Sequence, residues 1–259
     1  MKDFIKKYIR YFFLAFFGFT FILSLSILIM HMQDSKKDEN KYQEIRKEAK
    51  KKKKTEDSNR IDFKKLKEQN SDIYAWINMP DTVIDYPVLM SDETKDTDYY
   101  LEYNIDHSKG RPGCLYVEKE QPKDFSAFNT IIYGHNMYTS KTMFHPLTYL
   151  QDMDYFYEHD KFTIETEDAR RTYKIYCAVK RDDYHLLYYY DYANPVGRQK
   201  YVDDLKKAAE ADTKTSHIRS DIQIDVKKDK LVTLSTCVTR DNTHRYLVVG
   251  ILVDEKKFL

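Results

Sequence analysis

The chain has 259 residues, of which 42% are hydrophobic and 15% aromatic, and 43 basic side chains almost balance 42 acidic ones to leave a net charge of +1. The aromatic content excludes a disordered chain, and six Gly with six Pro exclude collagen-like or low-complexity architectures. The near-zero net charge gives no reason to expect a nucleic-acid partner, and three Cys cannot build a disulfide framework.

The first element in chain order is an apolar segment close to the N-terminus. No charged residue lies between Arg10 and Asp34, and a helix over this stretch is about 30 Å long, the thickness of a bilayer's hydrocarbon core. The apolar part of a cleaved signal peptide is usually shorter. We therefore predict an uncleaved transmembrane signal anchor over residues 11–33. The basic excess of residues 1–10 predicts a cytoplasmic tail, with everything after residue 34 outside the cell.

A strongly charged segment follows the apolar one. Residues 34–60 carry 11 basic and 7 acidic side chains, with five consecutive lysines over residues 50–54. A block of like charges mostly repels itself and stays extended, so we predict a solvated extracellular spacer that is helical in part. Binding of the lysines to anionic lipid head groups or wall polymers is the alternative.

Residues 61–259 have a globular composition and the length of one domain. Short runs with β-type patterning, bounded by turn residues, predict eight strands: 74–77, 82–88, 114–117, 130–133, 161–166, 171–180, 230–236 and 246–253. Apolar spacing predicts fewer helices: a lead-in beginning near Ile61, a short helix over 141–150 and an amphipathic one over 197–211. The domain is therefore mainly β, a barrel or sandwich with peripheral helices.

Two segments carry the residues best suited to chemistry. In Tyr133-Gly134-His135-Asn136 an apolar strand ends, and a histidine follows where the chain leaves the sheet. In the second segment, which runs from Leu231 to Cys237, alternation puts Thr233, Ser235 and the thiol on one strand face. The phosphate-loop, dinucleotide and common zinc motifs do not occur in this sequence.

Arg245 is the third feature, because it directly precedes the last strand. A hairpin through the polar stretch 239–245 would bring Arg245 close to Cys237. Neighbouring cations lower the pKa of a Cys thiol, and the thiolate is the nucleophile; His135 as imidazolium and Arg245 would both act in that direction. A guanidinium also suits the oxyanion of a tetrahedral intermediate, since it does not lose its proton. Arg240, in the middle of the same stretch, is the alternative arginine.

Tyr-Gly-His-Asn at 133–136, Thr-Leu-Ser-Thr-Cys at 233–237 and Arg245 together resemble the sortases, the membrane-anchored cysteine transpeptidases of Gram-positive cell surfaces. The long insertion between residues 180 and 230 is similar to that of the class B branch. The resemblance covers roughly residues 61–253 and implies an eight-stranded barrel.

For individual residues, the resemblance implies that His135, Cys237 and Arg245 are the catalytic triad. Tyr133, Ser235 and Thr236 would then line the substrate groove. The implied activity needs no metal or organic cofactor. Its partners would be surface proteins or pilins with a C-terminal sorting signal, and the acceptor would be an amine of a peptidoglycan precursor or of a pilin lysine.

Several alternatives stay open at this stage. The segment between Cys237 and Arg245 is shorter than in typical wall-anchoring class B enzymes, which affects the groove wall and hence substrate preference. An extracellular cysteine hydrolase acting on wall peptides would use the same His and Cys, and an inactive surface-binding module would use neither. Cys114 and Cys177 are packed thiols or a disulfide pair. The tyrosines of 184–192 form either a peptide-binding platform or a packed flap.

Overall fold

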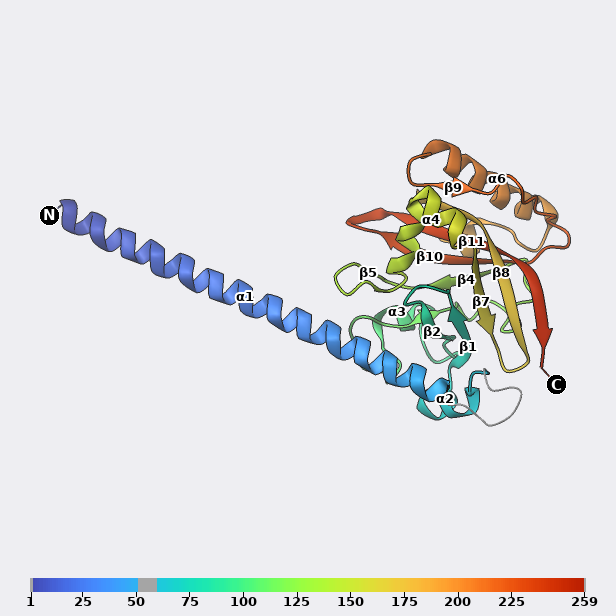
Figure 1. Cartoon of the computed structure of the whole chain (residues 1–259), viewed down its shortest axis with the longest axis horizontal. Coiled ribbons are helices and arrows are strands. Elements are labelled where there is room, and N and C mark those ends of the chain that lie inside the picture. Colours follow the sequence, from blue (N-terminus) through green and yellow to red (C-terminus); the bar gives the residue numbers. More distant parts are fainter. Residues whose placement is uncertain (1, 51–59, 259) are drawn as a thin grey trace. The chain divides into compact units, whose positions relative to one another are not determined.

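A computed structural model describes residues 2–50 and 60–258 of the chain (Figure 1). Contacts within the chain divide it into two compact units, Met1–Lys41 and Tyr42–Leu259. The elements in chain order are α1 (Lys2–Ala49), α2 (Phe63–Gln69), β1 (Ile73–Asn78), β2 (Asp85–Leu89), α3 (Tyr99–Glu102), β3 (Leu115–Tyr116), β4 (Asn129–Tyr133), β5 (Asn136–Met137), β6 (Thr142–Met143), the 3-10 helix η1 (His145–Gln151), α4 (Met153–Glu158), β7 (Lys161–Glu165), β8 (Ala169–Asp182), α5 (Leu186–Tyr189), α6 (Pro195–Ala211), β9 (His217–Ile218), β10 (Leu231–Val238) and β11 (Asp241–Lys257).

The first unit consists of the N-terminal part of α1. Within it the segment Tyr8–Met30 has a mean hydropathy of 2.5, and its most apolar stretch is not buried against the rest of the chain. The predicted apolar helix over 11–33 is therefore present, and it is long enough to cross a membrane. Of the five consecutive lysines in the sequence, the four at 51–54 lie outside the described residues.

The C-terminal end of α1 belongs to the second unit. Tyr42, Ile45 and Ala49 are buried in its core, and the Tyr42 hydroxyl donates a hydrogen bond to the Gly113 carbonyl at 2.6 Å. These three side chains lie at i, i+3 and i+7, the spacing of an apolar helix face. The folded unit thus begins inside the stretch 34–60, for which the charge pattern predicted only a spacer.

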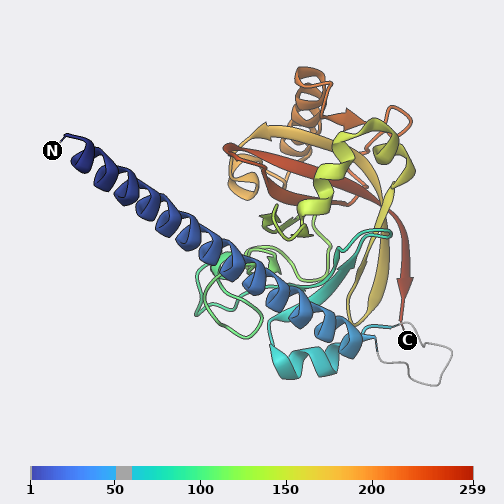
Figure 2. The same ribbon diagram turned by 60° about the vertical axis from the view of Figure 1, so that its left-hand side comes forward.

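The second unit is built on a closed barrel of eight strands, as predicted. The strands are hydrogen-bonded in the order β11-β10-β4-β3-β2-β1-β7-β8, and pairing of β8 with β11 closes the barrel, while β9 pairs with the outer edge of β8. The β2–β3 and β4–β10 pairs are parallel, and the other pairs in the barrel are antiparallel. The two long strands β8 and β11 run side by side in Figures 1 and 2.

Alternation along the strands separates two hydrophobic cores. Val232, Leu234 and Tyr246 point into the barrel with the main core, whereas Leu231 and Leu247 point outward to a second core that α6 covers. Figure 1 shows α6 lying along this outer side of the barrel. The face predicted for Leu231, Thr233, Ser235 and Cys237 is this outer face, because Thr233 Oγ1 lies 2.8 Å from Asn129 Oδ1 and 2.6 Å from the Tyr201 hydroxyl of α6.

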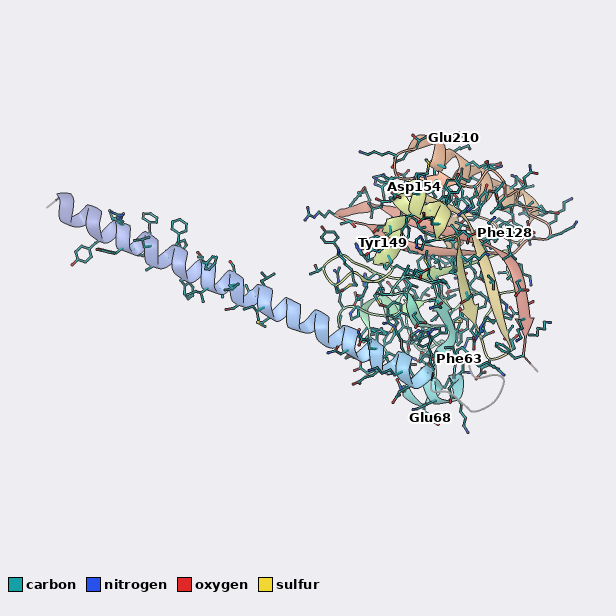
Figure 3. The ribbon with its side chains drawn as sticks, in the orientation of Figure 1. Phe63, Glu68, Phe128, Tyr149, Asp154 and Glu210 are labelled. Carbon is teal, nitrogen blue, oxygen red and sulfur yellow. The ribbon has the colours of Figure 1, made fainter. Side chains whose placement is uncertain are left out.

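Two of the three predicted helices are present. Residues near Ile61 lead into α2, in which Phe63 is buried and Glu68 is exposed (Figure 3). The amphipathic helix α6 begins at Pro195, slightly earlier than predicted. Asn194 caps it by accepting a hydrogen bond from the Gly197 amide at 2.9 Å, and Pro195 suits the first helical turn.

The predicted helix over 141–150 is wrong in its first part. Lys141 and Met143 have φ values of 57° and 54°, which a right-handed helix does not allow. A short hairpin of β5 and β6 takes this place, and η1 follows it from His145.

The polar stretch 239–245 is also not a loop throughout. Strand β11 begins at Asp241, and a tight turn with Arg240 at a φ of 60° joins it to β10. The hairpin was predicted, but the position of its tight turn was not, because the turn contains no Gly, the usual residue at positive φ.

Candidate functional site

The central strand of the site is β10, which lies between β4 and β11. Cys237 is directly opposite Arg245 on β11, and Ser235 is level with Tyr133 on β4. Directly paired residues on neighbouring strands present their side chains on the same sheet face. The structure therefore brings the predicted thiol and the predicted arginine together at one end of the outer face, beyond the part that α6 covers.

His135 follows β4 at the level of Cys237. The Gly134 amide donates to the Ser235 carbonyl at 3.1 Å, and the Asn136 side chain donates to the Cys237 carbonyl at 3.0 Å. These two bonds hold the chain that carries His135 against the chain that carries the thiol. A Cβ atom on Gly134 would lie 2.8 Å from the Phe144 ring and even closer to Leu115. A larger residue at this turn out of the sheet would therefore force the buried Leu115 and Phe144 side chains to move.

The protonation of His135 follows from its surroundings. Its Nε2 lies 2.8 Å from the Leu101 carbonyl oxygen, which can only accept, so Nε2 carries the proton and Nδ1 is an acceptor in the neutral ring. Burial lowers the pKa of His135 and the nearby Arg111 charge lowers it further, although the bond to Leu101 acts in the opposite direction. The resting ring is thus neutral, whereas the sequence argument assumed an imidazolium.

Arg245 is half-buried and held from two sides. Its Nη2 lies 2.7 Å from a carboxylate oxygen of Asp183, and its Nη1 donates to the His244 carbonyl at 3.3 Å. Arg240 is exposed at the hairpin turn, with its guanidinium 5.7 Å from the centre of the Tyr138 ring. Of the two candidate arginines, only Arg245 lies opposite Cys237 in the strand register.

The three predicted groove residues differ in their surroundings. Tyr133 is half-buried and donates to a Glu118 carboxylate oxygen at 3.3 Å, and Ser235 is buried beside it on the same face as Cys237. Thr236 points to the opposite face, and its hydroxyl donates to the Gly134 carbonyl at 2.8 Å. Thr236 therefore supports the turn before His135, and its side chain lies on the opposite sheet face from those of Tyr133 and Ser235.

Other neighbours of the site were not recognised in the sequence. Tyr116 is directly opposite Tyr133, and the two rings stack with their centres 5.5 Å apart. Burial raises the pKa of Tyr116 and Glu118 raises it further, while the charge of Arg245 lowers it. His185 Nε2 lies 2.8 Å from Glu118, so it links the segment after β8 to the segment after β3. No local motif marks these residues, because the barrel alone brings them together.

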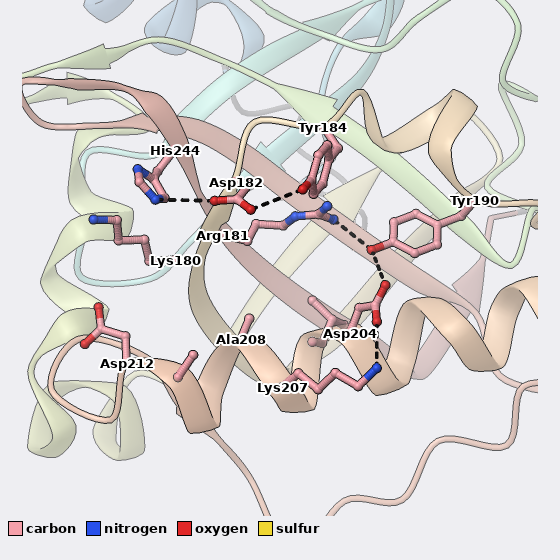
Figure 4. A pocket seen from close by; sticks show the side chains of 12 residues that line it. Lys180, Arg181, Asp182, Tyr184, Tyr190, Asp204, Lys207, Ala208, Asp212 and His244 are labelled. Carbon is pink, nitrogen blue, oxygen red and sulfur yellow. Dashed lines mark hydrogen bonds and ion pairs between the residues drawn. The ribbon is translucent and has the colours of Figure 1, made fainter.

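A cavity of about 510 Å³ lies between α6 and the end of β8 (Figure 4). Its walls include Arg181, Asp182, Asp204 and His244, so it adjoins the strand that carries Arg245 without containing Cys237. Arg181 donates to the Tyr190 hydroxyl at 3.0 Å, and this hydroxyl donates to Asp204 at 3.2 Å.

The tyrosines between residues 184 and 192 divide into a buried and an exposed group. Tyr190 is buried and Tyr192 packs against the core under α6, as a packed flap would. Tyr184, Tyr188 and Tyr189 are exposed, as a platform would require.

The three cysteines are all free thiols. Cys114 and Cys177 are buried, in the two different cores, and Cys237 is partly exposed. Burial raises the pKa of the Cys177 thiol far above its usual range, which makes that group unreactive. Among the described residues, no group of three His, Cys, Asp or Glu side chains could hold a metal ion.

A closed mixed barrel with a partly exposed thiol at a strand end, next to a histidine and opposite an arginine, corresponds to the class of cysteine transpeptidases. The family model of the sortase domain matches residues 77–253. Sortase B of Listeria monocytogenes is 31% identical over 196 residues, which cover 75% of each chain. The chain therefore belongs to the sortase family, a family of cysteine transpeptidases.

Solved structures of class B sortases share the fold. Sortase B of Bacillus anthracis in complex with AAEK1 superimposes with a TM-score of 0.70 at 27% identity, covering 86% of this chain and 99% of that one. A class B sortase of Streptococcus pyogenes involved in pilus biogenesis superimposes with a TM-score of 0.59 at 22% identity, covering 74% of this chain and 98% of that one. The resemblance to class B is thus confirmed.

Proposed function

We propose that this sortase cleaves a C-terminal sorting signal of surface proteins at Cys237 and transfers the protein to an amine. The observation that carries the proposal is the direct pairing of Cys237 with Arg245 in the strand register, with His135 level with the thiol on the other side. A nucleophile between a base and an oxyanion donor is the arrangement that acyl transfer requires.

The proposed reaction has two halves. Nδ1 of the neutral His135 accepts the thiol proton, and the Cys237 thiolate attacks the carbonyl carbon of a threonine in the sorting signal. Arg245 stabilises the oxyanion, and the His135 imidazolium donates its proton to the leaving amine, so that a thioester remains on Cys237. An acceptor amine then attacks the thioester. Its proton goes to His135 and returns to the thiolate, and a new amide bond is formed.

The location outside the membrane is part of the proposal. The span Tyr8–Met30 and the basic flank of residues 1–10 support an N-terminus in the cytoplasm and a catalytic domain on the extracellular side. Sorting signals and wall precursors are accessible there. In this arrangement the acceptor is a peptidoglycan precursor amine, for wall anchoring, or a pilin lysine, for pilus assembly.

The experiment that tests this function separates transfer from hydrolysis. The detergent-solubilised chain is incubated with a quenched-fluorescent peptide library that has a fixed threonine and randomised flanking positions, with and without a glycyl-peptide amine. We expect cleavage after threonine and a product joined to the added amine. Cleavage whose product is always the free acid would favour the hydrolase instead, and no cleavage together with a Cys237 that thiol reagents label no faster than Cys114 would favour the binding module.

A further inference from the structure

Two arginines face each other beside the thiol. Arg245 on β11 is directly opposite Arg181 on β8, just as it is opposite Cys237 on β10. Directly opposed residues share a sheet face, and like charges in that position repel each other. Strands lie about 4.8 Å apart, so the Cα atoms of Arg181 and Cys237 are roughly 10 Å apart.

Aromatic side chains draw the Arg181 guanidinium away from Arg245. Its guanidinium lies 5.2 Å from the ring centre of Tyr184 and 5.5 Å from that of Tyr190, and it donates to the Tyr190 hydroxyl (Figure 4). Contacts between a guanidinium and an aromatic ring at this distance are favourable. Arg181 is therefore part of the wall of the cavity between α6 and the end of β8.

Arg245 is restrained by a carboxylate. Asp183, the residue after β8, accepts from Nη2 of Arg245 at 2.7 Å. The Asp183 amide donates to the Thr243 carbonyl at 3.1 Å, so the backbone that carries this carboxylate is tied to the strand that carries the arginine. The His244 carbonyl accepts from Nη1 of the same guanidinium. Asp183 and the His244 carbonyl therefore both contribute to the orientation of the guanidinium.

We propose that Asp183 is a positioning residue for Arg245: its carboxylate fixes the direction of the guanidinium of the residue that is paired with Cys237. This inference rests on the proposed function, because it concerns the same acyl-transfer site. The side chains of Asp183 and Arg245 are 41% and 28% exposed, and ion pairs so accessible to solvent add little to the stability of a fold. The pair therefore acts on the orientation of one side chain.

The test compares three variants of the full chain. Asp183→Asn keeps the shape and removes the charge, and Asp183→Glu keeps the charge. Asp182→Asn is the matched control, because this neighbouring carboxylate contacts His244 and Tyr184 instead (Figure 4). For each variant, kcat and KM are measured on the library peptide that the wild type cleaves fastest, together with the thermal unfolding temperature.

We expect Asp183→Asn to lower kcat about tenfold with little change in KM, because a misplaced oxyanion donor affects the transition state more than binding. Asp183→Glu should recover part of the loss, Asp182→Asn should behave as the wild type, and all three should unfold near the wild-type temperature. Equal kcat values for Asp183→Asn and Asp182→Asn would overturn the inference, and so would loss of folding in Asp183→Asn, which would assign Asp183 to the fold. A wild type that cleaves no peptide would instead overturn the proposed function.

Discussion

Arg245 and Arg240 belong to the same hairpin but differ in what a lysine would retain. Arg245 presents a planar fork held by Asp183 and the His244 carbonyl, whereas Arg240 is exposed at the turn. Lysine keeps the charge of an arginine but has a compact ammonium that cannot make two parallel contacts.

We predict that Arg245→Lys lowers kcat/KM for peptide cleavage at least about tenfold, and that Arg240→Lys has little effect. Loss of an oxyanion donor in acyl-transfer enzymes costs on the order of 10²–10³ in rate, and the remaining charge should preserve part of this. Both variants are first checked for folding by circular dichroism. If instead Arg240→Lys lowers kcat/KM and Arg245→Lys does not, Arg240 is the arginine that faces the substrate.

His135 provides a pH-dependent prediction. Burial and the charge of Arg111 both lower the pKa of His135. The ring should therefore lose its proton at a pH below 6.5, the ordinary pKa of histidine. Removing the positive charge by Arg111→Gln should raise the pKa of His135, because the imidazolium is then repelled less. Histidine NMR titration measures this, with His135→Gln to assign the signal. A downward shift or no shift in Arg111→Gln at low salt would show that Arg111 does not act on the ring.

At this scale the sequence could mark the candidate reactive groups but not the groups that contact them. His135, Cys237 and Arg245 were predicted because strand ends and a recognisable pattern mark them. The Leu101 carbonyl that binds His135 was not predictable, since a main-chain acceptor has no side-chain signature. Asp183 was missed because the sequence does not show that β8 lies next to β11.

Among the elements, strands with strong alternation were predicted well and turns poorly. The strand of Leu231 to Cys237 has the predicted faces, because each of its outward residues meets α6 or the site. The prediction failed over the first part of 141–150 and missed the position of the turn within 239–245, where Lys141, Met143 and Arg240 adopt positive φ without being glycines. Such residues are uncommon in that region of backbone space, so residue type gives no warning.

The end of α1 allows a direct test of where the folded unit begins. Ile45 is buried in the main core and Glu44 on the same helix is exposed. We predict that Ile45→Ala lowers the free energy of unfolding of the second unit by about 2–5 kcal/mol, the usual range for truncating a buried isoleucine. Urea unfolding of the detergent-solubilised chain measures it. Glu44→Ala should cost little, and equal effects of the two changes would place this turn of the helix outside the core.

For the whole molecule, the pattern of expected strands and helices predicted a barrel or a sandwich, and the family resemblance decided for the barrel. Closure depends on the β8–β11 pair and on two parallel pairs between strands that are not connected by a hairpin. Pairings between distant segments leave no periodic trace in one sequence.

The orientation in the membrane is also a property of the whole chain. The apolar span and its basic N-terminal flank predict that the second unit lies outside the cell. Protease added to intact protoplasts should therefore remove the domain and leave a short membrane-bound fragment. Full protection until the protoplasts are lysed would reverse the orientation and remove access to extracellular substrates.

The central claim is that Cys237 carries the acyl group. The most direct measurement is mass spectrometry of the wild-type chain, quenched in acid during turnover of the best library peptide and then digested. We predict a thioester adduct on the peptide that contains Cys237, and no adduct or product in Cys237→Ala, whose fold should be intact because the thiol is partly exposed. An adduct on Cys114 or Cys177, or unchanged cleavage by Cys237→Ala, would contradict the account.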